Sequence, residues 1–193
     1  TNDPTFTTAN TQDGATWGLD RIDQVLLPLD TRFTNPNTGN GVRAYVVDTG
    51  VNSGHLDFEG RVVQGFTAIN DGSGTLDCNG HGTHVAGTIA SKTYGVAKQV
   101  TVVPVRVLDC NGSGFLSGVV SGLDWIAQNW TPGTPGVVNL SLGGGVSSTL
   151  DTAVESLVSK GLSVVVAAGN SASDACVSSP ARTPTFCQAR LLT

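Results

Sequence analysis

The chain has 193 residues, the length of one domain or of a large part of one. Only 13% of its residues are charged, 39% are hydrophobic and 25 are glycine, a composition that excludes a coiled coil and a disordered chain. The net charge of −5 and the lack of a Lys/Arg cluster argue against nucleic acid or an anionic membrane as a partner, and no apolar run reaches the ~18 residues of a membrane span. We therefore expect a globular protein with an aliphatic core.

Aliphatic runs alternate along the chain with segments of helical periodicity. In chain order they predict a strand at 41–47, a helix at 80–91, a strand at 100–108, a helix at 117–130, a strand at 137–142, a helix at 148–160 and a strand at 162–168. The helix at 148–160 begins with Ser148-x-x-Asp151, a pattern similar to a capping box. Buried strands separated by helices predict an α/β fold, a doubly wound parallel sheet with helices on both faces.

The N-terminus and the cysteines indicate an exported protein. The chain has no methionine and starts with Thr1, so we expect that a signal peptide and a pro-segment have been removed from a precursor. The cysteines fit disulfides, because no two of them have the short spacing of zinc ligands, which are the alternative. We expect a secreted protein. The cysteines are Cys78, Cys110, Cys176 and Cys187.

Polar and glycine residues follow the predicted strands. Asp48 follows the first strand, the loop 111–114 the second, the glycines 143–145 the third, and Asn170 the fourth. The carboxyl ends of parallel strands form the binding crevice of such a sheet, and His81 opens a helix that can face it. A carboxylate, an imidazole, an amide and glycine edges are the groups that acyl transfer uses.

Three segments of the sequence resemble the subtilase family of serine peptidases. They are Val47-Asp48-Thr49-Gly50, Asn79-Gly80-His81-Gly82-Thr83-His84-Val85-Ala86-Gly87-Thr88 and Ala167-Ala168-Gly169-Asn170. A finer resemblance, to the proteinase-K-like branch, lies in residues 17–24, 139–145 and 179–182. The resemblance covers 16–182 and implies a subtilisin-like fold. It also implies a secreted serine endopeptidase of broad specificity that hydrolyses peptide bonds by acyl transfer with an Asp-His-Ser triad.

The resemblance implies a role for each polar residue. His81 would be the general base that takes a proton from a serine and returns it to the leaving amine. Asp48 would hold the imidazole in the right tautomer and stabilise the imidazolium, and Asn170 would donate its side-chain amide to the tetrahedral oxyanion.

The resemblance also implies a groove for polypeptide substrates, whose main chain pairs with a loop edge on either side. The small residues Gly143, Ala167 and Gly169 imply a roomy apolar primary pocket, and therefore a broad preference for aromatic or aliphatic side chains before the scissile bond. The predicted edges are Gly112, Ser113 and Gly114 on one side and Ser141, Leu142 and Gly143 on the other.

A cluster of oxygen-donating side chains near the N-terminus has two interpretations. It is either a solvated face or a structural calcium site, because calcium takes 6–8 oxygen ligands from short loops of this kind. Some proteinase-K-like enzymes use this segment for calcium, although Arg32 stands where a further oxygen ligand is expected. The predicted ligands are Asp20, Asp23, Gln24 and Asp30.

The cysteines resemble those of the family only in part. Cys78 and Cys110 match a family disulfide that ties the loop before His81 to the start of the substrate loop. Cys176 matches a family half-cystine, but Cys187 does not lie where its partner would be, so the state of these two cysteines stays open.

Some of these residues also fit other kinds of site. Asp48-Thr49-Gly50 is the aspartic-protease triplet too, but that chemistry needs two carboxylates sharing a proton, and only one triplet is present. His81 and His84 could bind zinc, but no suitable acidic third ligand accompanies them. We interpret His84 as structural and His55 as a surface residue. Gly112-x-Gly114 weakly resembles a dinucleotide motif but lacks the third glycine.

The family resemblance ends after Arg182. Residues 183–193 diverge from the family, and no Gly-Thr-Ser or Gly-x-Ser-x-Gly sequence supplies a nucleophile. We expect residues 1–182 to form an incomplete subtilase-like peptidase domain whose C-terminal third is missing. A shifted reading frame or an alternative end of the message would explain the divergent tail 183–193.

Two functional hypotheses follow. The first is a serine endopeptidase present in a truncated form that is inactive alone, because it has no identifiable nucleophile. The alternative is a non-catalytic relative that binds peptides through its glycine edges. In both cases we expect a monomer whose missing segment exposes part of an aliphatic face and lowers its stability.

Overall fold

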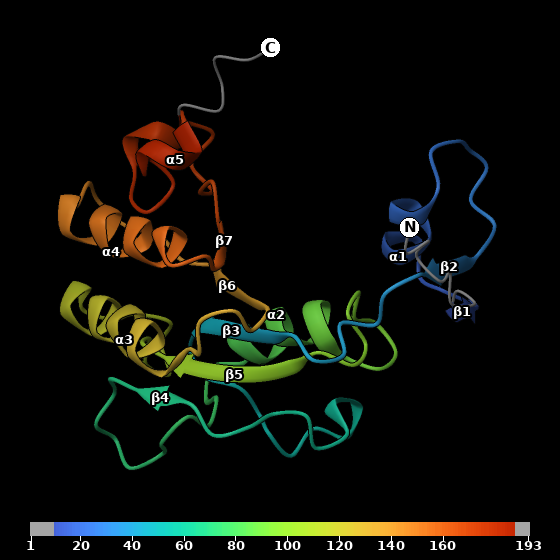
Figure 1. Ribbon diagram of the computed structural model, residues 1–193, viewed down its shortest axis with the longest axis horizontal. Coiled ribbons are helices and arrows are strands. Elements are labelled where there is room, and N and C mark those ends of the chain that lie inside the picture. Colours follow the sequence, from blue (N-terminus) through green and yellow to red (C-terminus); the bar gives the residue numbers. More distant parts are fainter. Residues whose placement is uncertain (1–9, 188–193) are drawn as a thin grey trace.

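The computed structural model describes residues 10–187, and its largest element is a five-stranded parallel sheet with the strand order β4-β5-β3-β6-β7 (Figure 1). Parallel pairing runs through the whole sheet, with β3 at its centre between β5 and β6. This confirms the predicted α/β fold. The strands are β3 (Arg43–Asp48), β4 (Phe66–Thr67), β5 (Thr101–Arg106), β6 (Gly136–Leu140) and β7 (Ser163–Val166).

Helices cover both faces of the sheet, as the doubly wound prediction requires. Side chains of a strand alternate between its two faces, so a strand is buried throughout only where both faces are covered. On β3, Tyr45 and Val47 belong to the core with α3 and α4, whereas Ala44 and Val46 belong to the core with α2. The helices are α2 (His81–Ala90), α3 (Leu116–Asn129) and α4 (Ser148–Ser159).

The start of α4 differs from the prediction by one residue. The N-cap is Ser147 and not Ser148, because the backbone of Ser147 is extended and its hydroxyl accepts a hydrogen bond from the N–H of Leu150. A residue that caps a helix must lie outside the helical conformation, and Ser148 is already inside it.

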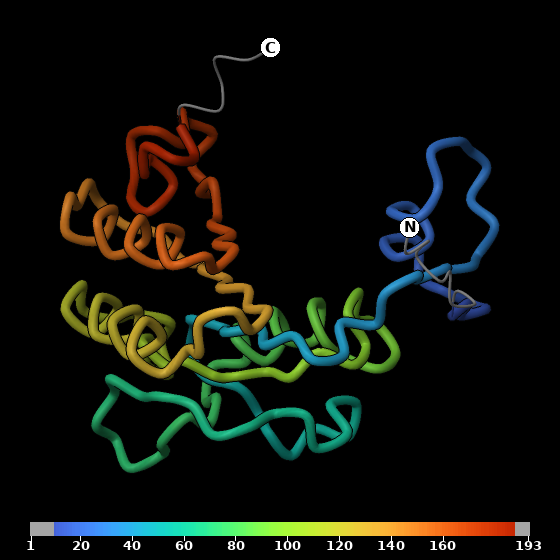
Figure 2. The backbone as a smooth tube through the Cα atoms, in the orientation of Figure 1, coloured from blue at the N-terminus to red at the C-terminus, as the bar shows by residue number. Residues whose placement is uncertain are grey.

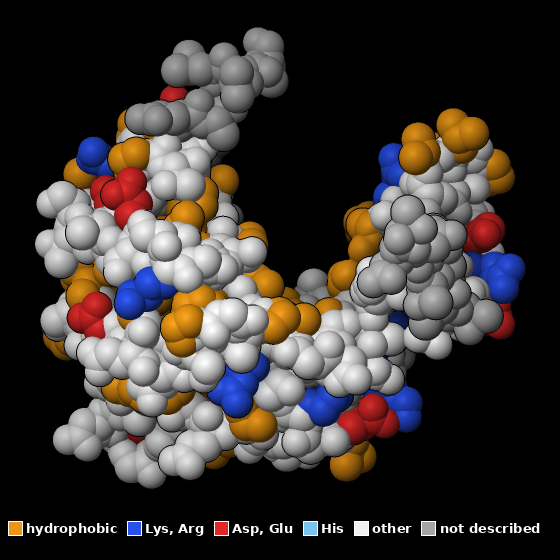
Figure 3. Space-filling model, viewed as in Figure 1, with side chains coloured by type: hydrophobic (Ala, Val, Ile, Leu, Met, Phe, Trp, Pro, Cys, Tyr) orange, Lys and Arg blue, Asp and Glu red, His pale blue; other side chains and the backbone are white. Residues whose placement is uncertain are grey.

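The N-terminal segment forms a small unit of its own, which the hydrophobic pattern did not predict. Strand β1 (Asn10–Asp13) pairs antiparallel with β2 (Arg32–Asn35), and α1 (Trp17–Asp23) lies between them in the sequence. Figure 2 shows this unit and the C-terminal segment on opposite sides of the molecule, and Figure 3 shows an open hollow between them. Hydrophobic side chains remain exposed on the unit, notably Trp17, Val25, Leu26 and Leu27.

The C-terminal part that follows β7 has little regular structure. Short helical turns occur at η2 (Ala175–Val177) and α5 (Pro184–Cys187), and a disulfide joins Cys176 to Cys187. The pairing that the sequence left open is therefore formed in this structure. Of the divergent tail 183–193, residues 188–193 lie outside the described residues.

Candidate active site

A buried carboxylate and a half-exposed imidazole meet at the carboxyl end of the central strand. Asp48 ends β3 and is fully buried, while His81 begins α2. The Nδ1 atom of His81 lies 2.8 Å from Oδ1 and 2.9 Å from Oδ2 of Asp48. A carboxylate accepts hydrogen bonds, so Nδ1 is the donor in this contact, and in a neutral imidazole this tautomer places the lone pair on Nε2.

Two glycines allow strand and helix to come this close. A Cβ atom on Gly82 would lie 2.1 Å from the carbonyl oxygen of Gly50 and 3.1 Å from the Cβ of Asp48. Gly50 itself has a φ of +109°, and a Cβ there would meet the carbonyl oxygen of Thr75 at 2.6 Å. A larger residue at Gly82 would therefore push the start of α2 away from Asp48, and one at Gly50 would displace the loop at Thr75 that leads into Asp77.

Thr49 connects the end of β3, which carries Asp48, to the start of α2, which carries His81. Its N–H donates to Asp48 Oδ1 (2.7 Å), so the backbone holds the carboxylate in place. Its hydroxyl accepts from the N–H of Gly82 (2.9 Å) and donates to Asp77 Oδ1 (2.9 Å). The end of β3 and the start of α2 are thus joined through one buried side chain.

Asp77 is the centre of the turn that leads into α2. Its Oδ1 accepts from the backbone N–H groups of Asn79 and Gly80, and its Oδ2 accepts from the N–H and the hydroxyl of Thr83. Burial raises the pKa of the Asp77 carboxyl, but hydrogen bonds from Gly80, Thr83 and Asn79 outweigh burial and lower the pKa to about 2. Asp77 was not among the predicted site residues, although Asn79-Gly80 two residues later signals a turn here.

A fully buried arginine stabilises the same region through hydrogen bonds and an ion pair. Arg106, at the end of β5, donates from Nε to the carbonyl oxygen of Thr49 (3.1 Å) and forms an ion pair with Asp71 (2.6 Å). Its hydrogen bonds hold the pKa of the Asp71 carboxyl well below the usual range. Its Nη2 also contacts the sulfur of Cys78, which forms a disulfide with Cys110. The predicted pair Cys78–Cys110 is therefore joined in this structure.

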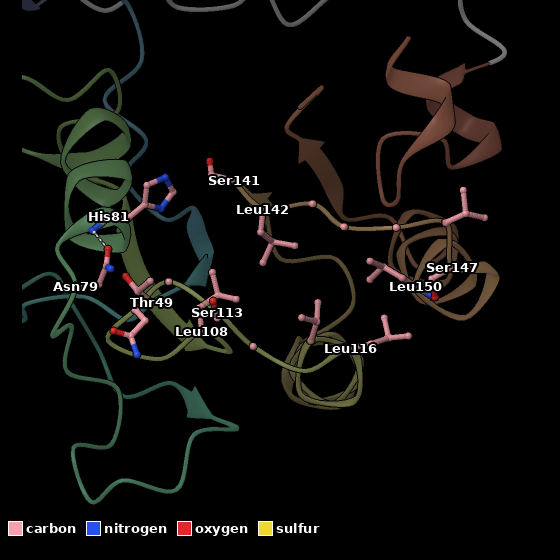
Figure 4. Close-up of a pocket in the computed structure, with 18 residues that line it drawn as sticks. Thr49, Asn79, His81, Leu108, Ser113, Leu116, Ser141, Leu142, Ser147 and Leu150 are labelled. Atoms are coloured by element: carbon pink, nitrogen blue, oxygen red, sulfur yellow. Dashed lines mark hydrogen bonds between the residues drawn. The ribbon is translucent and has the colours of Figure 1, made fainter. Parts of the chain in front are cut away.

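A cleft of about 790 Å³ extends from His81 along the carboxyl edge of the sheet. Figure 4 shows His81 at one end of the cleft and Leu116 and Leu150 toward the other, with Ser141 and Leu142 drawn between them. All of the predicted edge residues line this cleft: Gly112, Ser113, Gly114, Ser141, Leu142 and Gly143.

Asp109 fixes the conformation of the loop that forms the edge 112–114. The carboxylate of Asp109 accepts from the backbone N–H groups of Asn111 and Ser113, and the N–H of Asp109 donates to the carbonyl oxygen of Ser113. The hydrogen bonds from Ser113 and Asn111 lower the pKa of the Asp109 carboxyl, which therefore stays ionised near neutral pH. Asn79 joins this loop to the turn that leads into α2, since its Nδ2 donates to the carbonyl oxygen of Cys110.

Comparisons with known proteins give the family of the chain. The model of the subtilase family (Peptidase_S8) matches residues 39–187. The chain belongs to the subtilase family. It is 61% identical to an extracellular serine proteinase of Thermus sp. (strain Rt41A) over 89% of this chain and 41% of that protein. It is 54% identical to alkaline serine exoprotease A of Vibrio alginolyticus over 95% of this chain and 34% of that protein.

A solved subtilase has the same fold. The crystal structure of a cold adapted subtilisin-like serine proteinase matches with a TM-score of 0.86 and 55% identity, over 90% of this chain and 63% of that one. The chain thus spans less than two thirds of each of these relatives. Within residues 10–187, no helix combines the length and apolar character needed to cross a bilayer.

The predicted oxyanion residue does not join the cleft in this subtilase chain. Asn170 is exposed in the irregular segment after β7 and is not among the residues that line the cleft. The strand before it is covered on one face only, and Val165 is 54% exposed. The role of Asn170 therefore stays a prediction.

The side chains predicted to hold calcium are occupied by other partners. Asp20 accepts from the backbone N–H groups of Asp30 and Thr31, and Asp23 accepts from that of Thr34. The Gln24 amide nitrogen, and not its oxygen, faces the carbonyl oxygens of Leu26 and Pro28. As arranged, these groups do not converge on a cation, although subtilases commonly bind structural calcium.

The histidines fit no zinc site in the described part of the chain. Nδ1 of His81 is bonded to Asp48, and Nδ1 of His55 accepts from the N–H of Asp57. Among residues 10–187, the one group of three potential ligands close enough for a metal is Asp71 with Cys78 and Cys110, whose sulfurs are joined in the disulfide. A disulfide sulfur has no thiolate to offer a metal.

Proposed function

We propose that Asp48 and His81 are the orienting acid and the general base of a serine endopeptidase site. The observation that carries this proposal is the contact of His81 Nδ1 with the buried Asp48 carboxylate, 2.8 Å away at the mouth of the cleft. A base needs a free lone pair in the cleft and a fixed tautomer, and this contact supports both. Membership of the subtilase family supports the same assignment.

The proposed reaction is acyl transfer. His81 Nε2 takes the proton of a serine hydroxyl while the serine oxygen forms a bond to the scissile carbonyl carbon. The imidazolium then gives that proton to the leaving amine as the C–N bond breaks, and water releases the acyl group by the same steps. Asp48 accepts the hydrogen bond of the imidazolium and stabilises its charge, and Asn170 would donate to the oxyanion.

Replacing the carboxylate tests the acid–base pair. In any form of the protein that hydrolyses peptides, Asp48→Asn should lower kcat about 10⁴-fold because the imidazole then adopts the wrong tautomer. The exposed Asp124→Asn on α3 is the matched control and should leave kcat unchanged. Equal kcat values for both variants would overturn the role of Asp48.

We further propose that polypeptides bind in extended form between the two edges of the cleft, with a broad preference for aromatic or aliphatic side chains. Main-chain pairing of this kind tolerates many sequences, which supports the broad specificity. Titration of the ¹⁵N-labelled chain with an extended tetrapeptide ending in phenylalanine should shift the amide signals of Gly112, Gly114 and Gly143. Shifts confined to other parts of the chain would contradict this binding mode.

The 193-residue chain itself is proposed to be inactive, because its sequence contains no Gly-Thr-Ser or Gly-x-Ser-x-Gly segment. The alternative function, a peptide-binding protein without catalysis, predicts the same peptide binding without any hydrolysis. A fluorophosphonate probe separates the possibilities, since it labels only an activated serine. No labelling is expected. Labelling of Ser141, a serine that lines the same cleft as His81, would contradict the proposed inactivity.

Export from the cell is proposed on two grounds. Both cysteine pairs form disulfides, which persist in oxidising compartments, and the Thermus relative is named an extracellular proteinase.

Calcium remains a proposal that needs the Asp20–Asp30 segment to rearrange, and no catalytic step depends on it. If calcium binds there, millimolar CaCl₂ should raise the midpoint of thermal unfolding relative to EDTA, and Asp23→Asn should remove the difference.

A further inference from the structure

We propose that Asp77 is a positioning residue that fixes the geometry of the Asp48–His81 contact through Thr49 and the first turn of α2. This inference rests on the proposed function of that contact. Asp77 touches neither reacting group, but it hydrogen-bonds to the residue next to Asp48 and to the residue next to His81. It therefore lies between the two elements that the contact has to align.

The link on the strand side is one hydroxyl. Thr49 Oγ1 donates to Asp77 Oδ1 at 2.9 Å, and the N–H of the same residue donates to Asp48 at 2.7 Å. The Thr49 side chain is fully buried, so water cannot replace either bond. The position of the Asp77 carboxylate therefore helps to determine the position of the Asp48 carboxylate.

The link on the helix side uses backbone N–H groups. Gly80 and Thr83 donate to opposite oxygens of Asp77, at 2.9 Å each, on either side of His81 in the sequence. The first N–H groups of a helix have no partner within the helix, so a side chain that accepts two of them sets where the helix begins. The position of the His81 backbone follows from the same carboxylate.

An ionised group with two accepting oxygens is needed at this place. Oδ1 accepts from the Thr49 hydroxyl and two N–H groups, while Oδ2 accepts from both donors of Thr83. An amide oxygen can replace one of these oxygens, but the NH₂ group of an asparagine would face donors. The negative charge also lies at the N-terminus of α2, where the helix dipole favours it.

The test measures the contact itself and not activity. In the 193-residue chain, the His81 Nδ1–H proton can be followed by NMR, and its exchange with water reports how often the bond to Asp48 opens. Asp77→Asn and Thr49→Val each break the link and should speed this exchange about tenfold or more, the loss expected for one hydrogen bond to a charged group. Thr49→Ser keeps the hydroxyl and should restore slow exchange.

Asp57→Asn is the matched control. Asp57 also accepts from the N–H and the hydroxyl of one threonine, Thr93, and it bonds to Ser91 at the far end of α2, but not to Thr49 or to the first turn of α2. This variant should leave the His81 exchange rate unchanged. The double variant Asp77→Asn/Thr49→Val should exchange no faster than the faster single variant, because both changes break one link.

Three outcomes would overturn the proposal. The first is wild-type exchange in folded Asp77→Asn and Thr49→Val, and the second is equally fast exchange in Asp57→Asn. The third is loss of folded structure by circular dichroism in both Asp77→Asn and Thr49→Val while Thr49→Ser folds, since the link would then hold the fold and not the contact. Slow exchange that depends on Asp77, found together with no peptide binding, would overturn the proposed function and leave this inference standing.

Discussion

The centre and the edge of the parallel sheet differ in how completely they are covered. Every residue of β3 after Arg43 is buried, because α2 packs on one face and α3 with α4 on the other. On β7, Val164 and Val166 pack on the core, whereas Ser163 and Val165 are exposed. The Asp48–His81 contact arises from the covered centre, and Asn170 follows the open edge. Close packing around β3 fixes the positions of Asp48 and His81 relative to each other. At the exposed edge, the predicted catalytic residue Asn170 lies outside the cleft.

The largest effect on stability is expected from the charge buried behind the contact. Arg106→Met should lower the free energy of unfolding by about 3 kcal/mol, because Asp71 and the carbonyl oxygen of Thr49 lose their buried partner. The matched variant Arg32→Met removes a surface ion pair to Asp13 and should cost less than about 1 kcal/mol. Urea unfolding of both variants measures the difference, and equal losses would contradict the distinction between centre and surface.

A pair of valines compares centre and edge directly. Val46→Ala on β3 should cost about 2–3 kcal/mol, because two buried methyl groups are lost and a cavity is left. Val165→Ala on β7 should change the stability by less than about 0.5 kcal/mol, since its side chain is already half exposed. If chemical denaturation gave similar losses, the edge would be as well packed as the centre.

Low pH should lower the stability of the folded chain because Asp77 becomes protonated. Its pKa is lowered from 3.8 to about 2 in the folded chain, so the unfolded chain binds the proton more readily. The stabilisation is complete above about pH 4 and is lost as the pH falls toward 2. Asp77→Asn should therefore flatten the fall of the unfolding midpoint between pH 5 and about 2. Asp124→Asn is the control, and an identical fall in Asp77→Asn and wild type would refute the assignment.

A smaller loss of stability than that of Arg106→Met or Val46→Ala is expected at the start of α4. Ser147→Ala should cost about 1 kcal/mol, because the N–H of Leu150 loses its capping oxygen. Ser148→Ala, one residue further on, should leave the stability nearly unchanged. A larger loss for Ser148→Ala in thermal unfolding would return the cap to the position that the sequence pattern predicted.

The sequence predicted the central α/β core well, because its strands are continuous aliphatic runs. Segments such as 41–47 and 100–108 lie within a residue or two of β3 and β5. The resemblance to the subtilases brought Asp48 and His81 together from positions far apart in the chain, and the predicted edge residues line one cleft.

Polar contacts over long sequence distances were not predictable from pattern. Strands β1 and β2 are short and polar. They are stabilised by their antiparallel pairing and by side-chain hydrogen bonds such as that from the Thr31 N–H to Asp20. Thr49, Asp77 and Arg106 support the site through hydrogen bonds that have no periodicity in the sequence. The cap at Ser147 depended on the backbone conformation of a single residue.

The most direct test of the proposed site is a crystal structure of the chain with a bound, non-cleavable extended peptide. The expected result is a peptide main chain between residues 112–114 and 141–143, with the His81 ring hydrogen-bonded to Asp48 and its other nitrogen toward the peptide carbonyl. A peptide seated elsewhere, or a His81 ring turned away from a solvated Asp48, would contradict the assignment of this cleft.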